Sequence, residues 1–316
     1  MTQEKRRKIL YRILAVVAAI AIVLAGRSLY LHYQSIKEAP IQQDVPDTSQ
    51  TQSDSSVFAQ TSPDKPLYVL LLGTDGGDPQ QANFVGVAAI NKAKKHIDII
   101  MLPDDTKIEG RKEKGIQELQ DVYSEGGMSL VRAVVEDIFH IPIPYYATFT
   151  ADSFSKMVDL SGGVPIYVEK NMYHGDEATG KTDINLFQGY QTLTGKEAAG
   201  YMRYIDADGY LSRTQRQERF IKNFYEDRQD CFGVTNAFFM YRAWHNVDSN
   251  ISAKDMAQLA FDFRGVTADN IDFYILPGKN GDTKYYWTYD PVEVQKVIGR
   301  TNNAISTAPE PDDTKQ

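Results

Sequence analysis

The segment LYVLLLG, residues 67–73, is a continuous apolar run that ends at a glycine. Such a run is typical of a β-strand that is buried on both faces of a sheet. Residues 84–90 and 96–102 form two more apolar runs, and the turn-like sequence NKAKK joins them. We therefore expect three interior strands of one sheet at the start of the folded region.

Helical periodicity appears next, in the sequence SLVRAVVEDIFHI at residues 129–141. Its apolar residues recur three or four positions apart with the acids on the other face, which predicts an amphipathic helix. The downstream pattern predicts strands at 145–150, 164–168 and 271–276, and helices at 152–160, 194–203, 212–228, 236–244, 252–263 and 291–302. Strands mixed with crossover helices indicate an α/β fold, here a layered α-β-α domain with a central mixed sheet.

The N-terminal residues have the character of a membrane anchor. Residues 13–25 are all Ile, Leu, Ala or Val, and the flanking residues extend the predicted transmembrane signal anchor to 13–31. Residues 1–12 form a basic tail that is expected to stay in the cytoplasm, which places the C-terminal domain outside the cell. A signal peptide cleaved after Ala25 is the alternative, and it exports the domain equally.

The remaining residues divide by composition. Residues 32–65 are rich in Gln, Ser, Asp, Thr and Pro, which predicts a flexible stalk. Residues 306–316 have the same character and predict a disordered tail. Nothing interrupts residues 66–305, which we expect to form one domain.

Charge and cysteine content exclude two classes of protein. The chain of 316 residues has a formal net charge of −8. Residues 1–27 contain six basic residues against Glu4, a net +5, which leaves −13 on the remainder. A nucleic-acid-binding body is therefore not expected. Cys231 is the one cysteine, so an internal disulfide scaffold is excluded.

A series of motifs runs through the expected domain in a fixed order. They are LLLGTD at 70–75, AINKAKKHIDIIMLPDDT at 89–106, VYSEGG at 122–127, the glycine pair at 162–163, GYQTLTGKEAAGYMR at 189–203, SRTQRQ at 212–217 and ILPG at 275–278. This series resembles the LytR-CpsA-Psr family of Gram-positive cell-envelope proteins, also described as the cell envelope-related transcriptional attenuator domain. The resemblance covers nearly all of residues 66–305.

The resemblance implies a phosphotransferase that moves a glycopolymer from a polyprenyl-pyrophosphate carrier to peptidoglycan. It also implies Mg²⁺ or Mn²⁺ as the cofactor, an arginine cluster that holds the pyrophosphate, and an apolar tunnel between sheet and helices for the lipid. The expected partners are a polyprenyl-(pyro)phosphate lipid, peptidoglycan or a secondary cell-wall glycopolymer, and the membrane. Such transfer depends on cations that absorb charge on the phosphate oxygens, so the candidate site residues are charged ones.

Acidic residues follow the first and third expected strands. Asp75 comes at the end of the first strand and matches the family's first-strand aspartate. We expect Asp75 to act in catalysis and to bind the metal together with Asp105, with Asp104 as an alternative ligand.

Three arginines match the family's arginine positions. Arg203 ends an expected helix, and Arg213 and Arg216 lie one helical turn apart on the next. Guanidinium groups bind phosphate with two parallel hydrogen bonds, so we expect all three to bind the substrate pyrophosphate and to act in catalysis. Gln217 is expected to help position the substrate.

Several positions depart from the family pattern. Gln81 and Asn83 stand where the family has arginine and aspartate, Asp104 stands where it has the arginine of Pro-Arg-Asp, and Ile205 replaces the second arginine of Arg-x-Arg. The loss of one transition-state donor commonly lowers a rate by about 10² to 10³. We therefore expect a partly degenerate active site.

Two functions from different classes follow from these residues. The first is a membrane-anchored glycopolymer phosphotransferase. The alternative is a catalytically silent polyprenyl-phosphate-binding scaffold or regulatory paralogue, which the replaced residues favour. A third function, the binding of soluble glycans, is suggested by the aromatic residues Tyr285, Tyr286, Trp287 and Tyr289, although rings that pack on one another are the commoner explanation.

Overall fold

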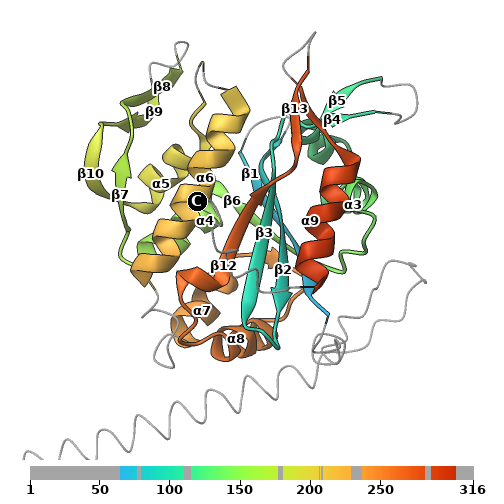
Figure 1. Cartoon of the computed structure of the whole chain (residues 1–316). Coiled ribbons are helices and arrows are strands. Elements are labelled where there is room, and N and C mark those ends of the chain that lie inside the picture. The colour runs from blue at the N-terminus through green and yellow to red at the C-terminus, as the bar shows by residue number, and fades with distance from the viewer. Residues whose placement is uncertain are drawn as a thin grey trace, which may run out of the picture. The chain divides into compact units, whose positions relative to one another are not determined.

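A central sheet organises the computed structural model, which describes residues 65–76, 80–109, 115–176, 181–205, 207, 209–228, 237–281 and 286–303 (Figure 1). Within those residues the sheet has six strands in the order β11–β6–β1–β2–β3–β12. Their bounds are β1 Leu67–Thr74, β2 Ala82–Asn91, β3 His96–Leu102, β6 Tyr145–Thr150, β11 Asp248–Ser249 and β12 Ile271–Ile275.

The strand directions make this a mixed sheet, as expected. β2 runs antiparallel to both β1 and β3, whereas β6 runs parallel to β1 and β12 runs parallel to β3. The four strands β1, β3, β6 and β12 therefore finish at one end of the sheet, which we call the carboxyl end. Loops after parallel strands gather at such an end, and ligands commonly bind there.

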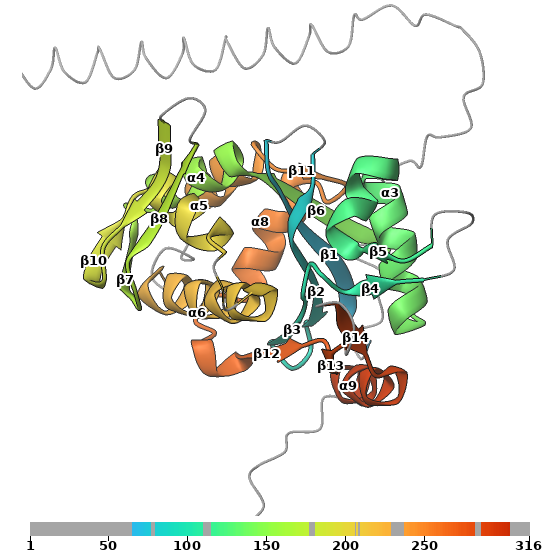
Figure 2. The same cartoon turned by 90° about the horizontal axis from the view of Figure 1, so that it is seen from above.

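Helices cover both faces of the sheet (Figure 2). On one face lie α3 (Leu119–Phe139) and α9 (Pro291–Asn303), whose apolar residues pack with Leu70 and Leu72 of β1 in a continuous core. On the other face lie α4 (Ala151–Leu160), α5 (Gly195–Arg203), α6 (Gly209–Arg228), α7 (Ala237–Trp244) and α8 (Ala253–Asp262). These layers confirm the expected α-β-α arrangement.

The helix expected at 129–141 begins earlier than its periodicity indicates. α3 starts at Leu119, and Gly126 and Gly127 interrupt it with non-helical backbone angles. Gly127 has a positive φ of 60°, which glycine adopts without strain. The apolar pattern marks only the part of α3 that follows this break.

Short sheets flank the central one. β7 (Val164–Val168) pairs with β10 (Gly189–Leu193), and β8 (Met172–Asp176) pairs with β9 (Lys181–Leu186). The remaining pairs are β4 (Lys107–Ile108) with β5 (Gln117–Glu118), and β13 (Gly278–Asn280) with β14 (Trp287–Tyr289). The strand expected at 164–168 is thus present, but it lies outside the central sheet.

The expected cytoplasmic tail, anchor, most of the stalk and the C-terminal tail lie outside the described residues, and these boundaries and that of the domain stay predictions. Among the residues that the structure describes, no helix is both long and apolar enough to cross a membrane.

Candidate active site

The acidic residues expected to bind metal leave the sheet together at its carboxyl end. Val85 of β2 pairs with Leu72 of β1 on one side and with Leu102 of β3 on the other. Asp75 comes three residues after Leu72, and Asp104 comes two residues after Leu102. Two apolar strands of matched length, joined through β2, therefore bring these acids to the same end of the molecule.

A β-bulge shapes the end of β1. Gly73 pairs with Phe84 and Thr74 pairs with Ala82, so Asn83 is the extra residue between them. A Cβ on Gly73 would lie 2.8 Å from the Cβ of Phe84 and 3.2 Å from Oδ1 of Asn83, so glycine is needed for this close approach. Bulges often re-aim side chains beside functional sites. Here the bulged Asn83 lines the cavity described below.

Asp75 is half-buried and is held by the chain that returns to β2. Its Oδ1 accepts a hydrogen bond of 3.0 Å from the backbone N–H of Gln81, and Nε2 of Gln80 donates to its carbonyl oxygen at 2.9 Å. The side chain of Gln81 donates to Oδ1 of Asp121 on α3 at 2.7 Å. The residue that replaces the family's arginine is thus directed to α3.

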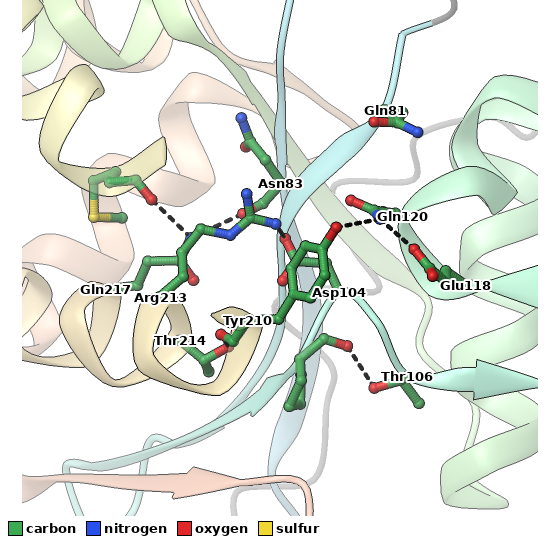
Figure 3. A network of polar contacts seen from close by, with 12 residues as sticks. Gln81, Asn83, Asp104, Thr106, Glu118, Gln120, Tyr210, Arg213, Thr214 and Gln217 are labelled. Carbon is green, nitrogen blue, oxygen red and sulfur yellow. Dashed lines mark hydrogen bonds and ion pairs between the residues drawn. The ribbon is translucent and has the colours of Figure 1, made fainter. Parts of the chain in front are cut away.

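Asp104 and Arg213 form a buried ion pair between the sheet and α6 (Figure 3). Asp104 is 2% exposed and Arg213 is 6% exposed. Burial raises the pKa of Asp104 to about 6, although the charge of Arg213 opposes the rise. The guanidinium group also lies 4.9 Å from the ring centre of Tyr210, a cation–π contact. Its Nε atom is buried and has no hydrogen-bond partner in the described part of the chain.

Asp105 is the residue that best fits the expected cation. Its Oδ1 atom is buried and lacks a hydrogen-bond partner among the described residues. Burial, reinforced by the adjacent Asp104 carboxylate and by Glu118, raises the pKa of Asp105 to about 7. A buried carboxylate oxygen without a donor is costly unless a cation or a proton satisfies it. Mg²⁺ and Mn²⁺ prefer oxygen ligands, so the chemistry of this site suits either ion.

A polar chain closes the site on the side of α3, as Figure 3 shows. Nε2 of Gln120 donates to Oε2 of Glu118 at 2.5 Å and to the hydroxyl of Tyr210 at 3.2 Å. The backbone N–H of Gln120 also donates to the carbonyl oxygen of Asp104 at 2.9 Å. The start of α3 and the start of α6 are therefore joined across the acidic end of the sheet.

Arg216 points in a different direction from the same helix. It is fully buried, and its Nε donates to Oε1 of Glu169 at 3.0 Å while Nη1 donates to the carbonyl oxygen of Tyr204 at 2.5 Å. Glu169 also accepts from the hydroxyl of Tyr201 at 2.9 Å and from Arg219 at 2.8 Å. Burial acts to raise the pKa of Glu169, but a backbone hydrogen bond, the side-chain hydrogen bonds from Arg216 and Tyr201, and the charge of Arg219 outweigh it, and the pKa is lowered. Arg216 thus joins α6 to the chain beyond β7.

Arg203 lies on the wall of an apolar cavity of about 210 Å³ between the sheet and helices α4, α5 and α6. Its Nη2 is 3.6 Å from Oδ2 of Asp183 on β9. Most of the wall is apolar, with Leu71, Phe84, Ile99, Phe149, Phe154, Met157, Phe220 and Phe224. A cavity therefore exists between sheet and helices, where the resemblance placed a lipid tunnel.

Gln217 is one of the polar residues in the wall of this cavity. Its Nε2 donates to the carbonyl oxygens of Asn83, at 2.8 Å, and of Met202, at 3.2 Å. The amide thus ties α6 to the bulge in β2 and to α5, which fixes the spacing between the cavity walls.

The three arginines contact three different carboxylates. Sequence spacing predicts that they converge on one anion, whereas in the structure each has its own acidic partner: Asp183 for Arg203, Asp104 for Arg213 and Glu169 for Arg216. The sequence gives no local indication that Glu169 is the partner of Arg216, because 47 positions separate the two residues. Binding of a shared pyrophosphate by these arginines stays a prediction.

Two other positions can be placed. Ile205, where the family has an arginine, is 40% exposed. In the aromatic cluster, Trp287 is buried in the core and its indole N–H donates to the carbonyl oxygen of Leu276 at 2.9 Å, whereas Tyr285 lies outside the described residues. Trp287 therefore packs inside the protein.

The sequence model of the LytR_cpsA_psr family matches residues 30–303 of this chain. The chain belongs to the LytR-CpsA-Psr family. This membership confirms the resemblance seen in the order of motifs.

Individual relatives in the LytR-CpsA-Psr family are distant. The polyisoprenyl-teichoic acid–peptidoglycan teichoic acid transferase TagU of Bacillus licheniformis is 24% identical over 314 residues, which cover 96% of this chain and 98% of TagU. The crystal structure of B. subtilis TagV has a TM-score of 0.64 at 22% identity, covering 77% of this chain and 99% of TagV. The structure of TagT bound to LIIa-WTA has a TM-score of 0.61 at 21% identity, and the match covers 83% of this chain and 100% of TagT. The two structures show that the α/β fold is shared.

Proposed function

We propose that this LytR-CpsA-Psr protein transfers a glycopolymer from a polyprenyl-pyrophosphate carrier to peptidoglycan. The observation that carries the proposal is the apolar cavity whose wall also contains Arg203 and Asn83 near the carboxyl end of the sheet. An isoprenoid chain requires an apolar enclosure, and its pyrophosphate requires cationic groups at the mouth of that enclosure. The names of TagU, a teichoic acid transferase, and of TagT bound to LIIa-WTA support this substrate class.

Each candidate residue has a role in this proposal. The cavity holds the isoprenoid, and Arg203 binds the pyrophosphate at its wall. Arg213 donates from its Nε, which has no hydrogen-bond partner in the described ranges, to the same pyrophosphate. The pyrophosphate then competes with Asp104 for the guanidinium group. Arg216 and Gln217 hold α6 against its neighbours, so that Arg213 keeps its place.

Asp75 and Asp105 would hold Mg²⁺ or Mn²⁺, with Asp104 as the alternative ligand. When bound, such an ion neutralises charge on phosphoryl oxygens. The buried Oδ1 atom of Asp105, which has no hydrogen-bond partner within the described part of the chain, favours an ion at this place.

The proposed location is the outer face of the cell membrane. The anchor at residues 13–31 and the basic tail before it support a single-pass protein with its C-terminal domain outside the cell. A protease added to intact cells should release the domain by cutting the stalk, and a domain that stays protected until lysis would contradict this topology.

A catalytically silent lipid-binding scaffold is the second candidate, and the Asp104–Arg213 pair favours it. An arginine that already has a buried carboxylate partner is less available to transition-state charge. Gln81 and Asn83 add no charge where the family has a cation and a carboxylate. A protein of this kind still binds the lipid in its cavity and through Arg203.

Turnover of a prenyl pyrophosphate separates the two candidates. The full-length protein, purified in detergent with Mg²⁺ or Mn²⁺, is mixed with geranylgeranyl pyrophosphate, and phosphate release and binding are measured together. Release that falls at least 100-fold in Asp75→Asn and is unchanged in the α6 control Lys222→Ala supports the enzyme. Binding without release supports the scaffold. If the protein neither binds the prenyl pyrophosphate nor releases phosphate from it, both candidates are overturned.

A further inference from the structure

A second group of metal-ligating side chains lies far from the acidic carboxyl end. His96 and Asp98 are two residues apart on β3, so both face the same side of the sheet. Asp272 of β12 stands directly opposite Asp98 in the parallel register. The group lies at the amino end of β3, whose seven residues separate it from Asp104 by about 20 Å.

The three ligand atoms are already close together. Nε2 of His96 lies 3.3 Å from Oδ1 of Asp98 and 3.4 Å from Oδ2 of Asp272. All three atoms lie within 4.8 Å of one another. A tetrahedral site with metal–ligand bonds of about 2.0–2.1 Å has edges of about 3.3–3.4 Å. Both distances from the imidazole match such an edge.

The charges of the group formed by His96, Asp98 and Asp272 favour a bound cation. Two carboxylates directly opposite on neighbouring strands repel each other. Asp98 is 5% exposed, and burial, together with repulsion from Asp272, raises its pKa against the opposing effect of His96. A neutral imidazole has one N–H, so Nε2 can donate to only one of the two carboxylates. A divalent ion satisfies both carboxylates and the imidazole nitrogen at once.

Outer contacts already orient the buried ligand. Tyr274 lies two residues after Asp272 in β12, and its hydroxyl makes a hydrogen bond with the side chain of Asp98. Ligating carboxylates in metal sites are characteristically held by such a second bond. Tyr68 lies close enough to interact electrostatically with Asp98, and its own hydroxyl is fixed by Thr301 and Asn302 of α9. The buried half of the group is therefore preorganised.

We propose that His96, Asp98 and Asp272 form a second divalent-metal site that fastens the edge strand β12 to β3. The ligand chemistry, one imidazole nitrogen and two carboxylate oxygens, suits Zn²⁺, with water in the fourth position. It differs from the all-oxygen set of Asp75 and Asp105, which suits Mg²⁺ or Mn²⁺. The proposal is independent of the function proposed for the carboxyl end.

Zinc titration of the full-length protein tests this site. The untagged protein is stripped of metal with a chelator and titrated with Zn²⁺ by calorimetry in excess Mg²⁺, which occupies the all-oxygen set. We expect one Zn²⁺ per chain that survives the Mg²⁺, a higher Tm with Zn²⁺, and an X-ray absorption spectrum with nitrogen and oxygen ligands and no sulfur.

Variants assign the bound zinc to these residues. His96→Ala and Asp272→Asn should each weaken zinc binding at least tenfold and abolish the rise in Tm, and Asp272 is 56% exposed, so its variant should fold. His174→Ala is the matched control, because His174 pairs with Asp183 at 2.5 Å on an exposed hairpin and belongs to no group of three metal-ligating side chains among the described residues. Asp105→Asn should also leave zinc binding unchanged. If the wild type binds no zinc, or if zinc binding persists in both His96→Ala and Asp272→Asn, the three side chains form only an ion pair and the proposal is overturned.

Discussion

Arg213 and Arg216 stand one turn apart on α6 and are both buried, yet they are held in opposite ways. Arg216 donates to Glu169 and to a backbone carbonyl, and it lies over the rings of Tyr201 and Tyr204. Arg213 donates to Asp104, and its Nε has no hydrogen-bond partner among the residues that the structure describes. The difference teaches that neighbouring arginines of one motif have separate tasks. Arg216 joins secondary-structure elements, whereas Arg213 pairs with a carboxylate at the end of the sheet and, under the proposed function, donates to an incoming anion.

The largest expected effect comes from breaking the Arg213 pair. Asp104→Ala leaves a buried guanidinium group without its carboxylate, which should lower the free energy of unfolding by about 3–5 kcal/mol. Urea denaturation measures this loss. The double variant Asp104→Ala/Arg213→Met, which removes both charges, should recover most of it. A single variant as stable as the wild type would show that the pair is not buried in solution.

The structural task of Arg216 can be compared with that of Arg219, which contacts the same oxygen of Glu169. Arg216→Ala removes a buried charge-assisted hydrogen bond and should lower the free energy of unfolding by about 1.5–3 kcal/mol. Arg219 is 49% exposed, so Arg219→Ala should cost less than about 1 kcal/mol. Equal losses in the two variants would contradict the assigned difference.

Ligand binding tests the task proposed for Arg213, together with that of Arg203. Arg203→Ala combined with Arg213→Ala should weaken geranylgeranyl pyrophosphate binding more than tenfold, since each charge-assisted contact contributes about 1.5–3 kcal/mol. Calorimetric titration measures the affinity, and Lys222→Ala on the exposed side of α6 is the control. An unchanged affinity in the double variant would remove both residues from the binding site.

Acidification gives the smallest expected effect. The pKa of Glu169 is lowered in the folded protein from its ordinary 4.5, because hydrogen bonds to the carboxylate outweigh its burial. Its contribution to stability is therefore present above pH 4.5 and is lost as pH falls through the folded-state pKa. The difference in Tm between wild type and Glu169→Gln should shrink as the pH is lowered from 7 to 3. A constant difference would mean that Glu169 makes no charge-dependent contribution.

Much of the fold is readable from local pattern. The strand expected at 96–102 coincides with β3, and the helix at 152–160 differs from α4 by one residue, because apolar spacing is a local property. The strands β8 and β9, which form a hairpin, and β10, which pairs with β7, have no counterpart among the expected elements. Their sequences MYHGD, KTDINL and GYQTL are short and largely polar, so they lack the apolar signal of the central strands.

The candidate site was predictable only in part. The sequence shows that Asp75 and Asp104 come after the first and third apolar runs, but that these two ends meet at one end of the sheet depends on the order and directions of β1, β2 and β3. The partner of Arg216 does not follow, because Glu169 reaches α6 only after β7 has packed against it. The bulge that re-aims Asn83 also depends on the register between β1 and β2, which apolar content alone leaves undetermined.

The parallel pairing of β12 with β3 limits how the protein can fold. β1, β2 and β3 are consecutive and form a local meander, whereas Ile97 of β3 and Ile271 of β12 are separated by over half of the chain. Long-range pairing must overcome loop-closure entropy before any contact compensates for it, which slows folding. We expect the meander to form early and the β12 edge to close last. The folding rate is then set by the arrival of the C-terminal third of the chain.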